Sequence, residues 1–147
     1  MDTRRAKRQA VPAGVEERWA EIDGKRIRYL RAGSGQPLLL VHGLMGYSFS
    51  WTENMVELGK HYSVYAPDLL NTGLSDRVEQ DGTLEVAARS LLAFMDAVGI
   101  NQTHVVGSSH GGTLVMVAGA LAPERFHHIV AVSPANGISE QSRWQAT

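Results

Sequence analysis

The sequence predicts an α/β fold in which a mostly parallel sheet is flanked by helices on both faces. Short apolar runs typical of buried strands alternate along the chain with segments of helical periodicity. This alternation is typical of strand–helix–strand crossovers, which join parallel strands. The composition, 44% apolar and 20% charged in 147 residues, is that of a globular domain with one core.

A β-hairpin is expected to open the domain. Residues 18–22 and 26–30 have strand character, and Asp23-Gly24 between them suits a tight hairpin turn. A Gly/Ser/Pro turn at 33–37 then leads into the continuous apolar run 38–41, which is typical of a central parallel strand buried on both faces.

The alternation continues to residue 106 with a helix, a strand, a second helix and a second strand. The firmest of these elements is the helix 83–98, because its apolar residues repeat at helical spacing. Thr83 is its expected N-cap, and Gly99 is expected to end it. The four predicted ranges are 51–59, 63–66, 83–98 and 104–106.

Two further elements complete the pattern. The segment 113–122 is apolar nearly all round, so it is expected to be a helix packed deep against the sheet and covered on its outer side. Pro123 ends it, and the run 129–132 indicates one more buried strand before a loop at 133–137. No internal repeat or linker divides the domain, which is assigned to residues 15–147.

Residues 1–14 are expected to form a disordered, basic tail, although the chain as a whole has a net charge of −1. A nucleic-acid or membrane contact through its four cations is the weaker alternative, since no aromatic residue or amphipathic stripe accompanies them. No apolar stretch has the length of a membrane span, and there is no cysteine. We therefore expect a cytoplasmic protein with a small-molecule substrate and neither a nucleic-acid nor a membrane partner. The four cations are Arg4, Arg5, Lys7 and Arg8.

A candidate nucleophile lies between the last predicted strand–helix pair. Gly107 and Gly111 stand two residues before and two residues after Ser109, as a sharp strand-to-helix turn requires. Ser108 fails the same test, because its neighbours at that distance are not glycines. The sequence therefore predicts Ser109 as the catalytic nucleophile.

A second candidate site follows the central strand, where His42 and Gly43 begin a loop of small residues that can turn backbone N–H groups toward a ligand. The N–H of Leu44 and the N–H of His110 are the predicted donors of an oxyanion hole. His42 is expected to order this loop through its ring hydrogen bonds.

On these residues the chain resembles the first half of an α/β-hydrolase of the esterase, lipase and C–C hydrolase type, over roughly residues 17–134. The loop at His42-Gly43, the turn at 66–77 and the helix exit at 123–126 are similar to the family pattern, although Asn71 replaces a frequent glycine. The resemblance implies acyl transfer from substrate to Ser109 and then to water. Neither a cofactor nor a metal is expected, because the sequence has no His-Glu-x-x-His spacing and Gly33-Ser34-Gly35 fails as a dinucleotide fingerprint. A serine at this position argues against the branches that use a carboxylate nucleophile.

Several other side chains have two interpretations. Asp68 and Asp76 are offered as triad acids, but structural roles in turns are favoured. The aromatic residues Tyr47, Phe49 and Trp51 either line an acyl pocket or pack in the core. The other two histidines considered, His127 and His128, are expected to be exposed rather than metal ligands.

The resemblance places the triad acid and then a histidine base after the nucleophile, and after Val132 the sequence holds Glu140 and no histidine. We therefore expect a fragment that is weakly active or inactive alone, in preference to a natural half-length protein. The last strand would then offer an unpaired edge for self-association. Two alternatives stay open: a C–C bond hydrolase or lyase on the same scaffold, and a non-catalytic binding protein built on half the fold.

Overall fold

In the computed structural model, residues 9–79 and 82–135 are described, and they form one six-stranded sheet. The strand order is β1-β2-β4-β3-β5-β6, with parallel pairing of β3 to β4, β3 to β5 and β5 to β6. Antiparallel pairs join β1 to β2 and β2 to β4. The strands are β1 (Val15–Ile22), β2 (Lys25–Ala32), β3 (Pro37–Val41), β4 (Ser63–Pro67), β5 (Thr103–Ser108) and β6 (Phe126–Val132). The predicted mostly parallel sheet is confirmed.

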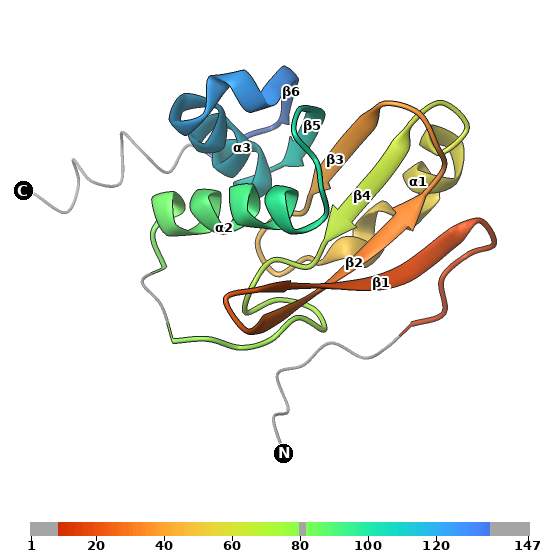
Figure 1. Ribbon diagram of the computed structural model, residues 1–147, viewed down its shortest axis with the longest axis horizontal. Coiled ribbons are helices and arrows are strands. Elements are labelled where there is room, and N and C mark those ends of the chain that lie inside the picture. The colour runs from red at the N-terminus through yellow and green to blue at the C-terminus, as the bar shows by residue number, and fades with distance from the viewer. Residues whose placement is uncertain (1–8, 80–81, 136–147) are drawn as a thin grey trace, which may run out of the picture.

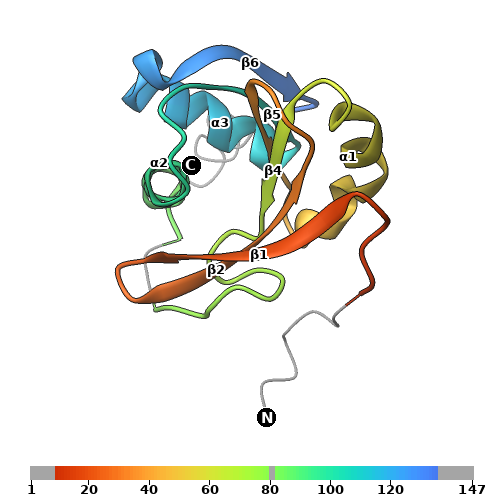
Figure 2. The ribbon, with the colours of Figure 1, turned by 45° about the vertical axis from the view of Figure 1, so that its right-hand side comes forward.

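Helices lie on both faces of this sheet, as predicted. Figures 1 and 2 show α2 (Leu84–Ala97) and α3 (His110–Leu121) on one face and α1 (Thr52–Leu58) on the other. Two short 3₁₀ helices, η1 (Ser48–Trp51) and η2 (Pro123–Arg125), precede α1 and β6. Among the described residues, no helix is both long and apolar enough to span a membrane.

Each face of the sheet has its own apolar core. Leu39, Val41 and Val105 pack with α2 and α3, whereas Leu38 and Leu40 pack with α1 on the opposite side. Successive residues of β3 thus enter different cores because side chains alternate across a strand. All of them are buried, which confirms the predicted central strand.

The predicted turn and cap residues have the expected backbone geometry. Asp23 and Gly24 both have positive φ, 49° and 75°, as a two-residue type I′ hairpin turn requires. The Thr83 hydroxyl accepts a hydrogen bond from the Val86 N–H at the start of α2, with 3.2 Å between nitrogen and oxygen. Gly99, with φ of 77°, follows the helix and ends it.

Two expectations about burial are wrong for the described residues. β6 is not a buried strand: Val130 is 50% exposed and Val132 is 46% exposed, because β6 is the edge of the sheet and pairs only with β5. The outer side of α3 is also uncovered, since Met116 is 54% exposed. An apolar sequence predicts burial, but a segment is buried only where neighbouring elements pack against it.

The basic tail is predicted over residues 1–14, and residues 1–8 of it lie outside the described residues. In the described part of the tail, Gln9 and Val11 contact the domain. The Gln9 amide donates a hydrogen bond to the Tyr47 hydroxyl, with 3.0 Å between the two atoms, and Val11 packs against the core beside α1.

Candidate active site

Ser109 occupies the one-residue connection between β5 and α3. Its backbone has φ of 53° and ψ of −119°, a conformation that non-glycine residues rarely adopt. The Ser109 N–H donates to the Val132 carbonyl at 2.9 Å, and the Ser109 carbonyl accepts from Gly112 and Ala135. These bonds hold the serine at the carboxyl end of the parallel strands, exposed to solvent.

The two flanking glycines are required by close approaches of the backbone. A Cβ at Gly107 would overlap the Gly111 carbonyl group, and a Cβ at Gly111 would overlap the carbonyl oxygens of Val41 and His42. The turn therefore closes only with glycine at these positions, which is the steric reason for the Gly-x-Ser-x-Gly spacing.

The loop after β3 lies directly against this turn. A Cβ built on Gly43 would stand 3.2 Å from the Ser108 carbonyl oxygen and 3.4 Å from the Ser109 Cβ. The loop reverses in a turn closed by the Gly46 N–H to the Gly43 carbonyl at 3.0 Å, with Met45 at φ of 62°. The structure thus brings Gly43 beside Ser109, as a shared site requires.

The two predicted oxyanion donors are both available in the described part of the chain. The N–H of Leu44, inside that turn, has no hydrogen-bond acceptor there. The N–H of His110 has none either, because the first N–H groups of a helix have no partner within it. Both groups are therefore free to bind an oxygen of a ligand.

His42 is buried behind the loop, and both of its ring nitrogens are engaged. The Leu69 N–H donates to Nε2 at 3.2 Å, so Nδ1 carries the ring proton and donates to the Gly43 carbonyl at 2.8 Å. Nε2 also lies 3.1 Å from the Thr72 hydroxyl. In this arrangement the ring joins the loop after β3 to the loop after β4 and has no free nitrogen for Ser109.

Burial lowers the pKa of His42 below its ordinary value of 6.5. The hydrogen bond to Gly43 and the charge of Asp68 act in the opposite direction, and His110 adds to the lowering. The neutral ring that the hydrogen bonds require is therefore the form that the site favours at neutral pH.

Asp68 is a fully buried junction of three segments. Its carboxylate accepts hydrogen bonds from the Arg28 guanidinium of β2 at 2.9 Å, from the Ser48 N–H at 2.8 Å and from the Leu74 N–H at 2.7 Å. Arg28 is 2% exposed and also lies 3.7 Å from the Glu17 carboxylate. Because both carboxylate oxygens accept hydrogen bonds from within the fold, Asp68 has a structural role, as the turn interpretation predicts.

Asp76 and Asn71 organise the same loop. The Asp76 carboxylate accepts from the Arg26 N–H at 2.8 Å, and the Asp76 N–H donates to the Arg26 carbonyl. Asn71 has φ of 68°, so it takes the left-handed conformation that allows it to replace a glycine. Neither Asp68 nor Asp76 is placed as a triad acid in this arrangement.

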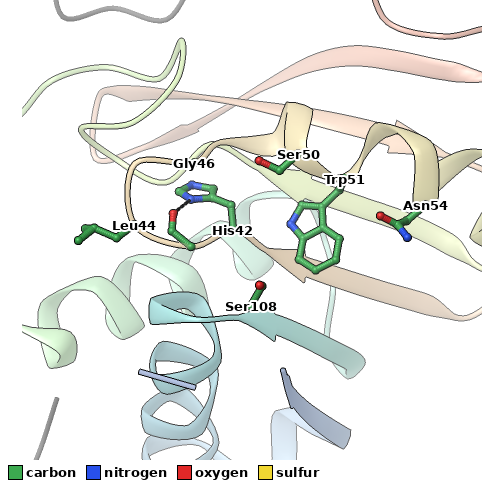
Figure 3. A pocket seen from close by; sticks show the side chains of 8 residues that line it. His42, Leu44, Gly46, Ser50, Trp51, Asn54 and Ser108 are labelled. Carbon is green, nitrogen blue, oxygen red and sulfur yellow. Dashed lines mark hydrogen bonds between the residues drawn. The ribbon is translucent and has the colours of Figure 1, made fainter. Parts of the chain in front are cut away.

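A cavity of about 280 Å³ opens between the loop after β3, α1 and the end of β5. Figure 3 shows the Trp51 ring and the Ser108 hydroxyl facing one another across it. Trp51 thus lines this cavity, which does not include Ser109 in its lining, while Phe49 stacks on Tyr47 with ring centroids 6.1 Å apart. The lining residues are His42, Gly43, Leu44, Gly46, Ser50, Trp51, Asn54 and Ser108.

Sequence reasoning did not assign Ser50, Asn54 and Ser108 to this cavity. A signal existed for Ser108, because it shares a strand face with Val106, which packs on the α1 side. No feature of the sequence indicated Ser50 or Asn54, because their position depends on how α1 packs against the sheet.

Residues 36–147 match the alpha/beta hydrolase fold family, and the chain therefore belongs to that family. It is 37% identical over 123 residues to the dihydrolipoyllysine-residue acetyltransferase component of the acetoin cleaving system of Cupriavidus necator, covering 83% of this chain and 33% of that protein. It is 32% identical over 116 residues to haloalkane dehalogenase 2 of Mycobacterium tuberculosis, covering 78% and 41%.

Among solved structures, the meta-cleavage product hydrolase CumD of Pseudomonas fluorescens IP01 superposes with a TM-score of 0.75 at 29% identity, over 80% of this chain and 44% of that one. The family predicted from the sequence is confirmed. The chain spans about a third of the length of the first curated relative and less than half of the other two proteins.

Proposed function

We propose that the whole protein is a serine hydrolase in which Ser109 attacks an ester-like carbonyl and forms an acyl-enzyme. The observation that carries this proposal is the backbone of Ser109, strained at φ of 53° and exposed at a strand-to-helix turn beside a loop with a free N–H. Strain of this kind persists only where the surroundings enforce it, and it is concentrated at functional sites.

The chemistry would proceed in two displacements. The Ser109 oxygen bonds to the carbonyl carbon while its proton passes to a general base, and the carbonyl oxygen becomes an oxyanion. The free N–H groups of Leu44 and His110 would donate to that oxyanion, and the positive end of the α3 dipole favours the same charge. The alcohol leaves with the proton, and water then releases the acid.

The general base and its acidic partner are proposed to come from outside the described residues. His42 has both ring nitrogens engaged, and the Asp68 carboxylate is held by three hydrogen bonds within the fold. Because the chain spans about a third of its first curated relative, activity is a property of the whole protein. Alone, Ser109 would be a weak nucleophile.

C–C bond hydrolysis is the second candidate, and the similarity to a meta-cleavage product hydrolase favours it. The same serine and oxyanion donors would serve, with a carbon leaving group in place of an alkoxide. Product analysis with aryl esters and with vinylogous diketones separates the two substrate classes, because each gives a distinct acid and leaving group.

The test is labelling of the full-length protein with a fluorophosphonate, which reacts with activated serines. Wild type is expected to be labelled and to lose esterase activity in parallel. The Ser109→Ala variant is expected to resist labelling, whereas Ser108→Ala, the matched control one residue away, is labelled. Unlabelled wild type with intact fold, or labelling that survives Ser109→Ala, would overturn the proposal and favour a binding protein.

A further inference from the structure

Three histidines gather at the opposite end of β5 from Ser109. His104 of β5 faces His127 and His128 of β6, with ring centroids 5.3 Å and 5.1 Å from that of His104. Five residues along a strand separate His104 from Ser109, a distance of roughly 16 Å. The cluster is therefore not part of the proposed catalytic site.

A β-bulge creates this arrangement. Thr103 pairs with Phe126, but the next residue, His104, pairs with His128, so that His127 is an extra residue in β6. Without the bulge, His127 would stand opposite His104. The shift instead sets His104 and His128 as a cross-strand pair with nearly parallel rings, 20° apart.

The two rings of this pair direct the same nitrogen toward each other. The Nδ1 atoms of His104 and His128 are 3.1 Å apart. On the far side of the His104 ring, Nε2 lies 3.1 Å from the Gln36 side-chain oxygen, which can only accept, so Nε2 carries the proton of the neutral ring. The Nδ1 lone pair of His104 therefore faces His128, which donates its own Nδ1 proton.

This spacing also fits a shared metal ion. Two nitrogens, each about 2.0–2.1 Å from a metal, lie roughly 2.9–3.4 Å apart when the angle at the metal is about 90–110°. We propose that His104 and His128 chelate one divalent transition-metal ion, Zn²⁺, Ni²⁺ or Cu²⁺, through their Nδ1 atoms, with water completing the coordination. His128 would then hold its proton on Nε2, so no proton is gained or lost.

Two features of the surroundings support this site. Gln36 fixes the His104 ring as an outer-shell partner does at known metal sites. His128 is exposed, which leaves an entry path. Within the described residues no set of three or more ligands stands ready, so the site is a two-nitrogen chelate.

Isothermal titration of the tag-free, full-length protein with Zn²⁺ and with Cu²⁺ tests the proposal. One saturable site is expected, with Cu²⁺ bound more tightly than Zn²⁺. His104→Gln and His128→Gln should each weaken binding at least about tenfold, since loss of an outer-shell partner alone costs that much. Gln36→Ala should weaken it as well.

His61→Gln is the matched control, because His61 is an exposed histidine outside the cluster. It should leave metal binding unchanged. The proposal is overturned if wild type shows no saturable site, or if the His104 and His128 variants bind as wild type does. Far-UV circular dichroism of the same variants shows that they are folded, a control that does not depend on the proposed hydrolase activity.

Discussion

At the scale of single residues, the turn that carries Ser109 depends on glycine at position 111. The backbone of Gly111 approaches the carbonyls of Val41 and His42 so closely that any side chain would collide. The sequence could reveal this because the requirement is local and repeats in a short motif. It could not reveal the bond between Asp68 and Arg28, which are 40 positions apart.

Gly111→Ala is expected to lower the free energy of unfolding of the full-length protein by roughly 1–3 kcal/mol, because the added methyl group overpacks a closed turn. Urea unfolding measures this change. Gly82→Ala is the control, since a Cβ at Gly82 meets nothing within 4 Å. Equal stability of the two variants would contradict the steric account of the turn.

The pH dependence of stability should report the buried His42. Its folded-state pKa lies below its ordinary value, so the neutral ring stabilises the fold fully above pH 6.5. That contribution is lost as the pH falls through the folded-state pKa, because the unfolded chain binds the proton more readily.

Unfolding free energies between pH 5 and pH 7.5 test this expectation in wild type and in His42→Gln. The wild type should lose more stability on acidification than the variant does. His104 also has a lowered pKa, so His104→Gln serves as a control that retains the contribution of His42. Parallel curves for wild type and His42→Gln would rule the assignment out.

At the scale of elements, the alternation of strands and helices predicts the order and the faces correctly, because periodicity is a property of each segment. The burial of β6 and of the outer side of α3, in contrast, depends on which other segments pack against them and not on their own periodicity. Val130 and Met116 are apolar yet about half exposed, at 50% and 54%. Apolar sequence thus predicted these elements correctly and their surroundings incorrectly.

Asp68 joins β2, the start of η1 and the loop after β4, and its removal should loosen all three. Asp68→Asn leaves the Arg28 charge buried without its closest partner, and we expect a loss of about 3 kcal/mol in unfolding free energy. Esterase activity should fall too, because Ser48 follows the oxyanion loop and is held by Asp68.

Asp96→Asn is the matched control for this prediction. Asp96 also pairs with an arginine, Arg125, at 2.7 Å, but its side chain is 67% exposed. Exposed pairs contribute little to stability, so urea unfolding should show a much smaller change. A loss at Asp68 no greater than that at Asp96 would contradict the junction role.

At the scale of the whole molecule, the described residues form a sheet with one apolar edge. Ile129, Val130 and Val132 of β6 are each between 39% and 50% exposed, and an open edge strand is a template for pairing. We predict that the 147-residue chain, studied alone, associates with itself through this edge in a concentration-dependent manner.

Sedimentation velocity measures this association. Val130→Lys should shift the chain toward monomer, because a charge on an edge strand opposes pairing. Val56→Lys is the control, since Val56 of α1 is 44% exposed but lies away from the edge. A wild-type chain that is monomeric at all concentrations, or an equal effect of both substitutions, would refute the prediction.

If Ser109 carries the acyl group during turnover, intact-mass spectrometry of the full-length protein during reaction with an aryl ester should detect that group on the chain. We expect a transient mass increase of one acyl group, mapped by proteolysis to the peptide at Ser109 and absent in Ser109→Ala but present in Ser108→Ala. Hydrolysis without any acyl adduct, or an adduct mapped to another residue, would contradict it.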